Sequence, residues 1–148
     1  MDPREPWRLE DTEAQVHPEF FEMWLSLLRE DWASLVIVPT DHAISTYPVT
    51  APLAEIAKLN AFRVFDAQRV SVADGLKLGA RLAQAASAGS RTIVILDSLM
   101  ESLGSVSVAN QANRALVVVQ LGVSRSDSLQ STIGLVGRDK ILGCALLH

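Results

Sequence analysis

The sequence predicts an α/β domain in three layers, with a mainly parallel sheet of about five strands between helices on both faces. Of its 148 residues, 49% are hydrophobic, which suits one core that buries about 70% of the unfolded surface. Short apolar runs alternate with helical segments, the order expected of parallel strands joined by helical crossovers. Most of these runs are continuously apolar, as is typical of strands covered on both faces.

The chain divides into an arm and one domain. Residues 1–16 are charged and proline-bearing and predict a flexible N-terminal arm, in which Trp7 is a candidate anchor on the domain or on a partner. Residues 17–148 are predicted to form the single α/β domain. Its expected strands are Leu35–Val38, Phe62–Phe65, Thr92–Leu96, Ala115–Leu121 and Ile141–Leu147. Its expected helices run from Pro18 to about Asp31, and over Ala51–Leu59, Val72–Ala88, Val106–Asn113 and Ser126–Val136, with an exposed loop over Ser98–Val108.

The first helix has two apolar stripes. One contains Phe21, Leu25, Leu28 and Trp32 at helical spacing, and the simpler interpretation is that this stripe packs on the sheet. The other contains Phe20, Trp24 and Leu27 and is a candidate partner-binding face.

Composition excludes several classes of function. A net charge of -4 and a pI near 5.3 leave no electrostatic footprint for nucleic acid or anionic lipid. The single cysteine, Cys144, rules out a disulfide framework and favours a reducing cytoplasm. No signal peptide or membrane-spanning run is present, so membrane association is expected only through a partner. His17, His42 and His148 show no metal-ligand spacing, and neither a metal nor a cofactor is expected.

Two strands end in an acid, at the edge where open parallel sheets bind ligands. Asp66 closes one run and Asp97 another, each after four apolar residues. In nucleotide-hydrolysing α/β proteins such acids hold Mg²⁺ or orient the attacking water. Either acid alone is more simply a cap of the following turn, whereas the pair leaves open a site or the relic of one.

The segment after the first strand, Pro39–Leu59, lacks the residues of a phosphate loop. Such a loop needs glycines, so that backbone amides approach the anion, and a lysine for the outer phosphates. The first glycine of the chain is Gly75 and the first lysine is Lys58. The position of the loop is occupied by Ser45, Thr46, Tyr47 and Pro48, and Thr50 is the expected cap of the next helix.

The same segment carries the polar residues Asp41, His42, Ser45 and Tyr47. A histidine and a serine near an aspartate suggest hydrolysis, but the G-x-S-x-G turn is absent and polar loops are common. A small ligand-binding enzyme that uses Asp41, His42, Asp66 and Asp97 remains an alternative.

Three stretches beyond Arg91 carry a family resemblance: RTIVILDS, then ANRALVVVQLGVSRSDSL, then IGLVGRDKILGCALL. They resemble the C-terminal half of the bacterial tyrosine kinases of capsule and exopolysaccharide synthesis, in the MinD/ParA class of P-loop ATPases. Asp97 and Ser98 match an Asp-Ser strand end of that family, and Asn113 stands where the family has aspartate. Weaker similarity covers Glu19–Glu30 and Phe62–Arg69, in which Gln68 replaces a family acid.

The resemblance implies that Asp66 and Asp97 inherit the positions of the two magnesium-site acids. The departures imply loss of chemistry: the glycine-lysine loop is missing, and Tyr47 is the only tyrosine, so no C-terminal tyrosine cluster exists. Glu22 and Leu25 replace the arginines of the family's oligomerisation helix. Because a phosphate-loop lysine supplies transition-state charge stabilisation, no kinase or ATPase activity is expected.

The sequence therefore predicts a non-catalytic, pseudokinase-like regulator or scaffold of exopolysaccharide or capsule export. It would act in the cytoplasm by protein–protein binding, recruited to the inner membrane by a partner. A MinD/ParA-type positioning adaptor for another envelope machine is an alternative. Since nucleotide-class relatives commonly pair through the ligand-bearing face, a homodimer stays open.

Overall fold

The computed structural model describes residues 18–148 and contains one parallel five-stranded sheet in the order β2-β3-β1-β4-β5. The arm over residues 1–16, with Trp7, lies outside the described residues. The strands are β1 (Ser34–Pro39), β2 (Arg63–Asp66), β3 (Thr92–Ile95), β4 (Arg114–Gln120) and β5 (Ile141–Leu147). The predicted parallel sheet is confirmed.

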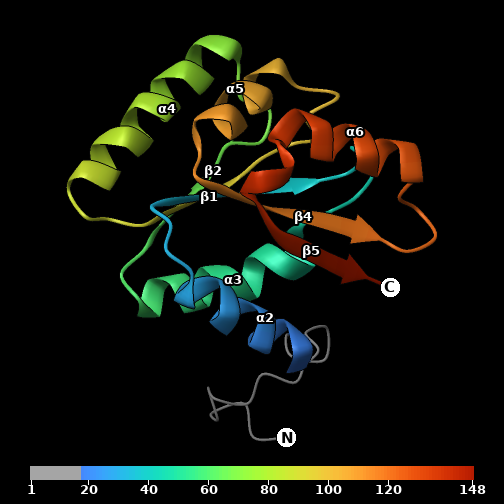
Figure 1. Cartoon of the computed structure of the whole chain (residues 1–148), viewed down its shortest axis with the longest axis horizontal. Helices are drawn as coiled ribbons and strands as arrows, with labels where there is room; N and C mark the ends of the chain where they lie inside the picture. The colour runs from blue at the N-terminus through green and yellow to red at the C-terminus, as the bar shows by residue number, and fades with distance from the viewer. Residues whose placement is uncertain (1–17) are drawn as a thin grey trace, which may run out of the picture.

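Helices cover both faces of the sheet and complete three layers (Figure 1). On one face lie α2 (Pro18–Arg29) and α3 (Tyr47–Leu59). On the other face lie α4 (Val72–Ser87), α5 (Leu103–Gln111) and α6 (Ser126–Val136), and a short 3-10 helix η1 (Arg138–Lys140) leads into β5. None of the helices in residues 18–148 combines the length and the apolar character needed to cross a membrane.

The central strand β1 joins the two halves of the core. All of its residues are buried, and it pairs with β3 on one side and β4 on the other. Leu35 and Ile37 pack toward α2 and α3, whereas Val36 and Val38 pack toward the opposite helices. This is the alternation of a strand covered on both faces, and it explains the continuous apolar run in the sequence.

The sheet-facing side of α2 differs from the prediction. Trp24 and Leu27 are 0% and 5% exposed in the core, while Leu25 is 51% exposed. The expectation that Trp24 and Leu27 belong to a partner-binding face is therefore wrong, and the side chain of Phe20 lies outside the description. The helix ends at Arg29, so Trp32 is not part of a helical stripe and instead donates its indole N–H to the Leu27 carbonyl at 2.7 Å.

Two helices begin earlier than the sequence suggested. Helix α3 starts at Tyr47 instead of Ala51. Helix α5 starts at Leu103 in the stretch predicted as a loop, because the Ser102 hydroxyl accepts a hydrogen bond from the Ser105 amide at 3.1 Å and caps it. Serine is ambiguous in sequence because it favours both loops and helix caps.

Gly104, in the first turn of α5, permits a close approach to the connection between β2 and α4. A Cβ atom at this position would overlap the Val70 carbonyl oxygen and lie 2.7 Å from that of Ser71. Gly75 of α4 faces the same point, where a Cβ would lie 2.7 Å from the Gly104 carbonyl oxygen. The absence of side chains therefore sets how closely α4 and α5 pack.

We predict opposite effects for two glycine-to-alanine changes in helices. Gly104→Ala should lower the free energy of unfolding by about 1–3 kcal/mol, because the added methyl group meets backbone atoms. Gly134→Ala, in α6 with open space around it, should raise it by about 0.5–1 kcal/mol. Urea unfolding of both variants measures the two effects, and equal effects would contradict the packing argument.

Candidate functional site

The polypeptide connections diverge at the carboxyl end of β1. The chain leaves β1 toward α3 on one face, whereas β3 and β4 are followed by α5 and α6 on the other face (Figure 1). In open parallel sheets, ligands bind at such a divergence, beyond the carboxyl ends of the strands. This edge is therefore where a site is expected.

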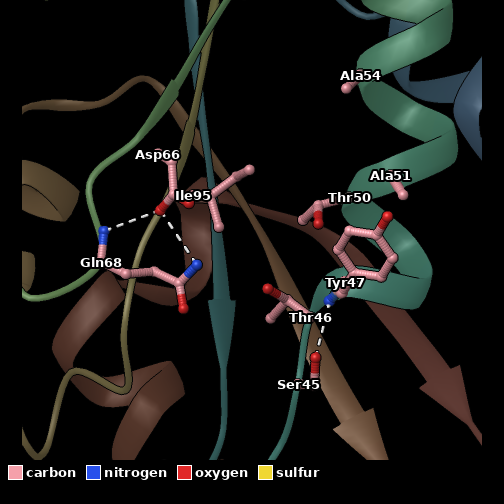
Figure 2. A pocket seen from close by; sticks show the side chains of 9 residues that line it. All are labelled: Ser45, Thr46, Tyr47, Thr50, Ala51, Ala54, Asp66, Gln68 and Ile95. Atoms are coloured by element: carbon pink, nitrogen blue, oxygen red, sulfur yellow. Dashed lines mark hydrogen bonds between the residues drawn. The ribbon is translucent and has the colours of Figure 1, made fainter.

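A cavity of about 230 Å³ lies at this edge, between the start of α3 and the end of β2 (Figure 2). It brings together the turn expected at the phosphate-loop position and one of the two strand-end acids. Its lining consists of Ser45, Thr46, Tyr47, Thr50, Ala51, Ala54, Asp66, Gln68 and Ile95. Pro48, the fourth residue at the phosphate-loop position, is not part of the lining.

The first turn of α3 offers few amide donors to a ligand. The Tyr47 amide donates to the Ser45 hydroxyl at 3.3 Å, and Pro48 has no amide hydrogen. The amides of Val49 and Thr50 both donate to the Thr46 carbonyl, at 2.9 and 2.8 Å. A phosphate cradle uses free amides at this position, and these four residues supply none.

Asp66 is held by the residue two positions further along. Its Oδ1 accepts hydrogen bonds from the backbone amide of Gln68 at 3.2 Å and from the Gln68 Nε2 at 3.1 Å (Figure 2). This is an Asx-type turn, as the simpler interpretation of a strand-end acid expects. The other carboxylate oxygen, Oδ2, makes no hydrogen bond or ion pair with any residue of 18–148 and remains an acceptor at the cavity.

Thr46 and Thr50 are both only 6% exposed, and both line the cavity. Neither hydroxyl makes a hydrogen bond within the described part of the chain. The prediction that Thr50 caps α3 is wrong, because the helix begins before it and places it inside. The available signal in the sequence was the spacing of four residues, which puts both threonines on one side of a helix.

Asp97 takes part in a different contact. Its Oδ2 accepts a hydrogen bond from the Arg69 backbone amide and so ties the β3–α5 connection to the β2–α4 connection. It lines a separate open hollow with Arg69 and Glu101. Asp66 and Asp97 follow neighbouring strands, yet they do not line the same cavity.

The polar residues after β1 do not form a hydrolytic arrangement. Asp41 accepts a hydrogen bond from the Thr40 hydroxyl at 3.2 Å, and His42 pairs with Glu101 at 3.5 Å on the surface. The Ser45 hydroxyl is used by the Tyr47 amide. Across residues 18–148, no hydrogen bond joins His42 to Ser45 or Asp41, so the donor–acceptor relay of a serine hydrolase is not formed.

Asn113 lies at the opposite, amino edge of the sheet. The side-chain Oδ1 of Asn113 accepts hydrogen bonds from the backbone amides of Ala33 at 2.7 Å and Ser34 at 3.0 Å. The backbone amide of Asn113 donates to the Ser34 hydroxyl at 2.9 Å. Asn113, which stands at a family aspartate position, thus links the starts of β1 and β4 by hydrogen bonds, and we call this contact the Asn113 brace.

Metal-ligating groups do not gather in the described part of the chain. No three His, Cys, Asp or Glu side chains of residues 18–148 lie together as a metal site would require. Cys144 is exposed at a small groove between α2 and β5, with Met23 and Leu27, where partial burial raises the pKa of its thiol. The cysteine is remote from the cavity at α3.

Comparisons with known proteins agree on the fold alone. No protein-family model matches the chain, and no curated protein matches its sequence. Among solved structures it is similar to the kinase domain of Escherichia coli tyrosine kinase ETK, with a TM-score of 0.66 and 10% identity over 86% of this chain and 71% of that chain. The predicted resemblance to bacterial tyrosine kinases is confirmed at the level of a P-loop NTPase-like fold.

We predict that the Asn113 brace contributes to stability and not to the cavity. Asn113→Ala removes the acceptor of two backbone amides and should lower the free energy of unfolding by about 1–3 kcal/mol. Asn113→Asp keeps an acceptor oxygen and should lose much less near neutral pH. Urea unfolding compares the two variants. Equal losses of unfolding free energy would show that the acceptor oxygen of Asn113 is not what stabilises the fold.

Proposed function

We propose that the protein is a non-catalytic relative of the bacterial tyrosine kinase domains. It would act as a regulator or scaffold of exopolysaccharide or capsule synthesis and export, by binding protein partners. We place it in the cytoplasm, recruited to the inner membrane by a partner. The support is the similarity in fold to the kinase domain of E. coli ETK, together with the sequence resemblance beyond Arg91.

The observation that carries the non-catalytic part is the turn between β1 and α3. A nucleoside triphosphate needs amide donors and a cation at this position. The amides of the first turn are occupied or missing, and no lysine or arginine lines the cavity. The residues present therefore do not fit a triphosphate.

Calorimetric titration with Mg²⁺-ATP and Mg²⁺-ADP tests this directly. We expect no binding tighter than about 1 mM, because the cavity offers the phosphates neither a cationic side chain nor a free backbone amide from the first turn of α3. The E. coli ETK kinase domain in the same buffer is the positive control. Tight binding or turnover of ATP by this chain would refute the non-catalytic proposal.

Complementation tests the role in export. We expect deletion of the gene to reduce exopolysaccharide or capsule, and the Asp97→Asn variant to restore it as fully as the unchanged gene. The substitution removes the charge that a magnesium site needs, but it retains an acceptor for the Arg69 amide. An unchanged amount of polysaccharide after deletion of the gene would exclude this function. If the Asp97→Asn variant accumulates as a stable protein but does not restore the polysaccharide, the result would argue for catalysis.

A further inference from the structure

The cavity between α3 and β2 has both polar and apolar residues in its lining. Thr46 and Thr50 are residues only 6% exposed, and their hydroxyls make no hydrogen bond with any residue of 18–148. Neither hydroxyl oxygen is among the fully enclosed unpartnered polar atoms of residues 18–148, so both are open to hydrogen bonds from water or a ligand in the cavity. In Figure 2 they lie on one wall of the cavity, opposite Asp66 and Gln68.

The hydrogen-bonding capacity of the lining defines the class of ligand. The hydroxyls of Ser45, Thr46 and Thr50 both donate and accept, while Asp66 Oδ2 only accepts and the amide group of Gln68 does both. A ligand that satisfies this lining must itself donate and accept. A phosphate group brings negative charge against the carboxylate of Asp66, and an ammonium group only donates, so neither satisfies the whole lining.

The remaining lining is apolar. The methyl groups of Ala51 and Ala54, on α3 with Thr50, and the side chain of Ile95, beside Asp66, also line the cavity (Figure 2). The ring of Tyr47, which is 70% exposed, stands at the entrance as a flat apolar surface with a polar tip. The volume of about 230 Å³ is below the range of about 300–1,000 Å³ found for drug-sized ligands, so the site takes one ring-sized molecule.

From these observations we propose that the cavity binds a single neutral sugar ring. Vicinal hydroxyl groups of the sugar donate to Asp66 Oδ2 and exchange hydrogen bonds with Thr46 and Thr50. The C–H face of the ring packs on Tyr47 and the alanines. The proposal stands on the lining of the cavity and does not depend on the proposed role in export.

Ligand-observed NMR and calorimetry on the full chain test the proposal. The probes are hexoses, N-acetylhexosamines and 6-deoxyhexoses, each at concentrations up to tens of millimolar, with inorganic phosphate and a short diamine as comparators. We expect at least one sugar to bind, and neither comparator to compete with it. Absence of binding by every sugar overturns the proposal, as does a stronger response to phosphate or the diamine.

Three variants place the binding in this cavity. Asp66→Asn and Thr50→Val each preserve side-chain size and should weaken sugar binding about fivefold to tenfold, because each removes one hydrogen-bonding function. Asp139→Asn removes an exposed acid of η1, at the other edge of the sheet, and should bind as the unchanged protein does. Since the Thr50 hydroxyl has no protein partner, Thr50→Val should fold with unchanged stability, which urea unfolding checks. Equal binding by all three variants places the sugar elsewhere and overturns the assignment.

Discussion

The burial of β1 on both faces is the constraint on which the rest of the structure depends. A strand with apolar contacts above and below must lie inside the sheet, and β1 pairs with β3 and β4 along its length. The connection to α3 therefore leaves from the middle of the carboxyl edge and not from its margin. The neighbouring strands β3 and β4 are followed by helices on the other face of the sheet. The polar residues after β1 therefore share a cavity with those at the end of β2.

The two edges of the sheet have different roles. At the amino edge, polar side chains brace the framework: Asn113 joins the starts of β1 and β4, and the Arg91 guanidinium donates to the carbonyls of Leu28 and Glu30 at 2.8 and 2.6 Å, close to the end of α2. Arg91 also lies 4.7 Å from the ring centroid of Trp32. At the carboxyl edge, Thr46 and Thr50 leave hydrogen-bonding capacity unused. The stabilising contacts of Asn113 and Arg91 thus lie at one end of the strands, and the candidate site lies at the other end.

Much of the fold was predictable from the sequence, and less of the site. The five strands follow from continuous apolar runs, and the positions of Asp66 and Asp97 at strand ends follow from the same pattern. The inner face of α2 was not predictable, since the helix has apolar residues on two sides and periodicity does not rank them. The place of Thr50 inside α3 was not predictable either, because threonine suits a helix cap as well as a helix interior beside a cavity.

The sequence by itself determined the order of strands and helices, the acids that close two strands, and the lack of glycine and lysine in the turn after β1. These properties depend on residues close together in the chain. Only the tertiary structure decided that Trp24 and Leu27 face the core, that Asp66 shares a cavity with Thr50 while Asp97 does not, and that Asn113 is a brace. Each of these depends on contacts between segments distant in sequence, and those contacts are set by how the helices pack on the sheet.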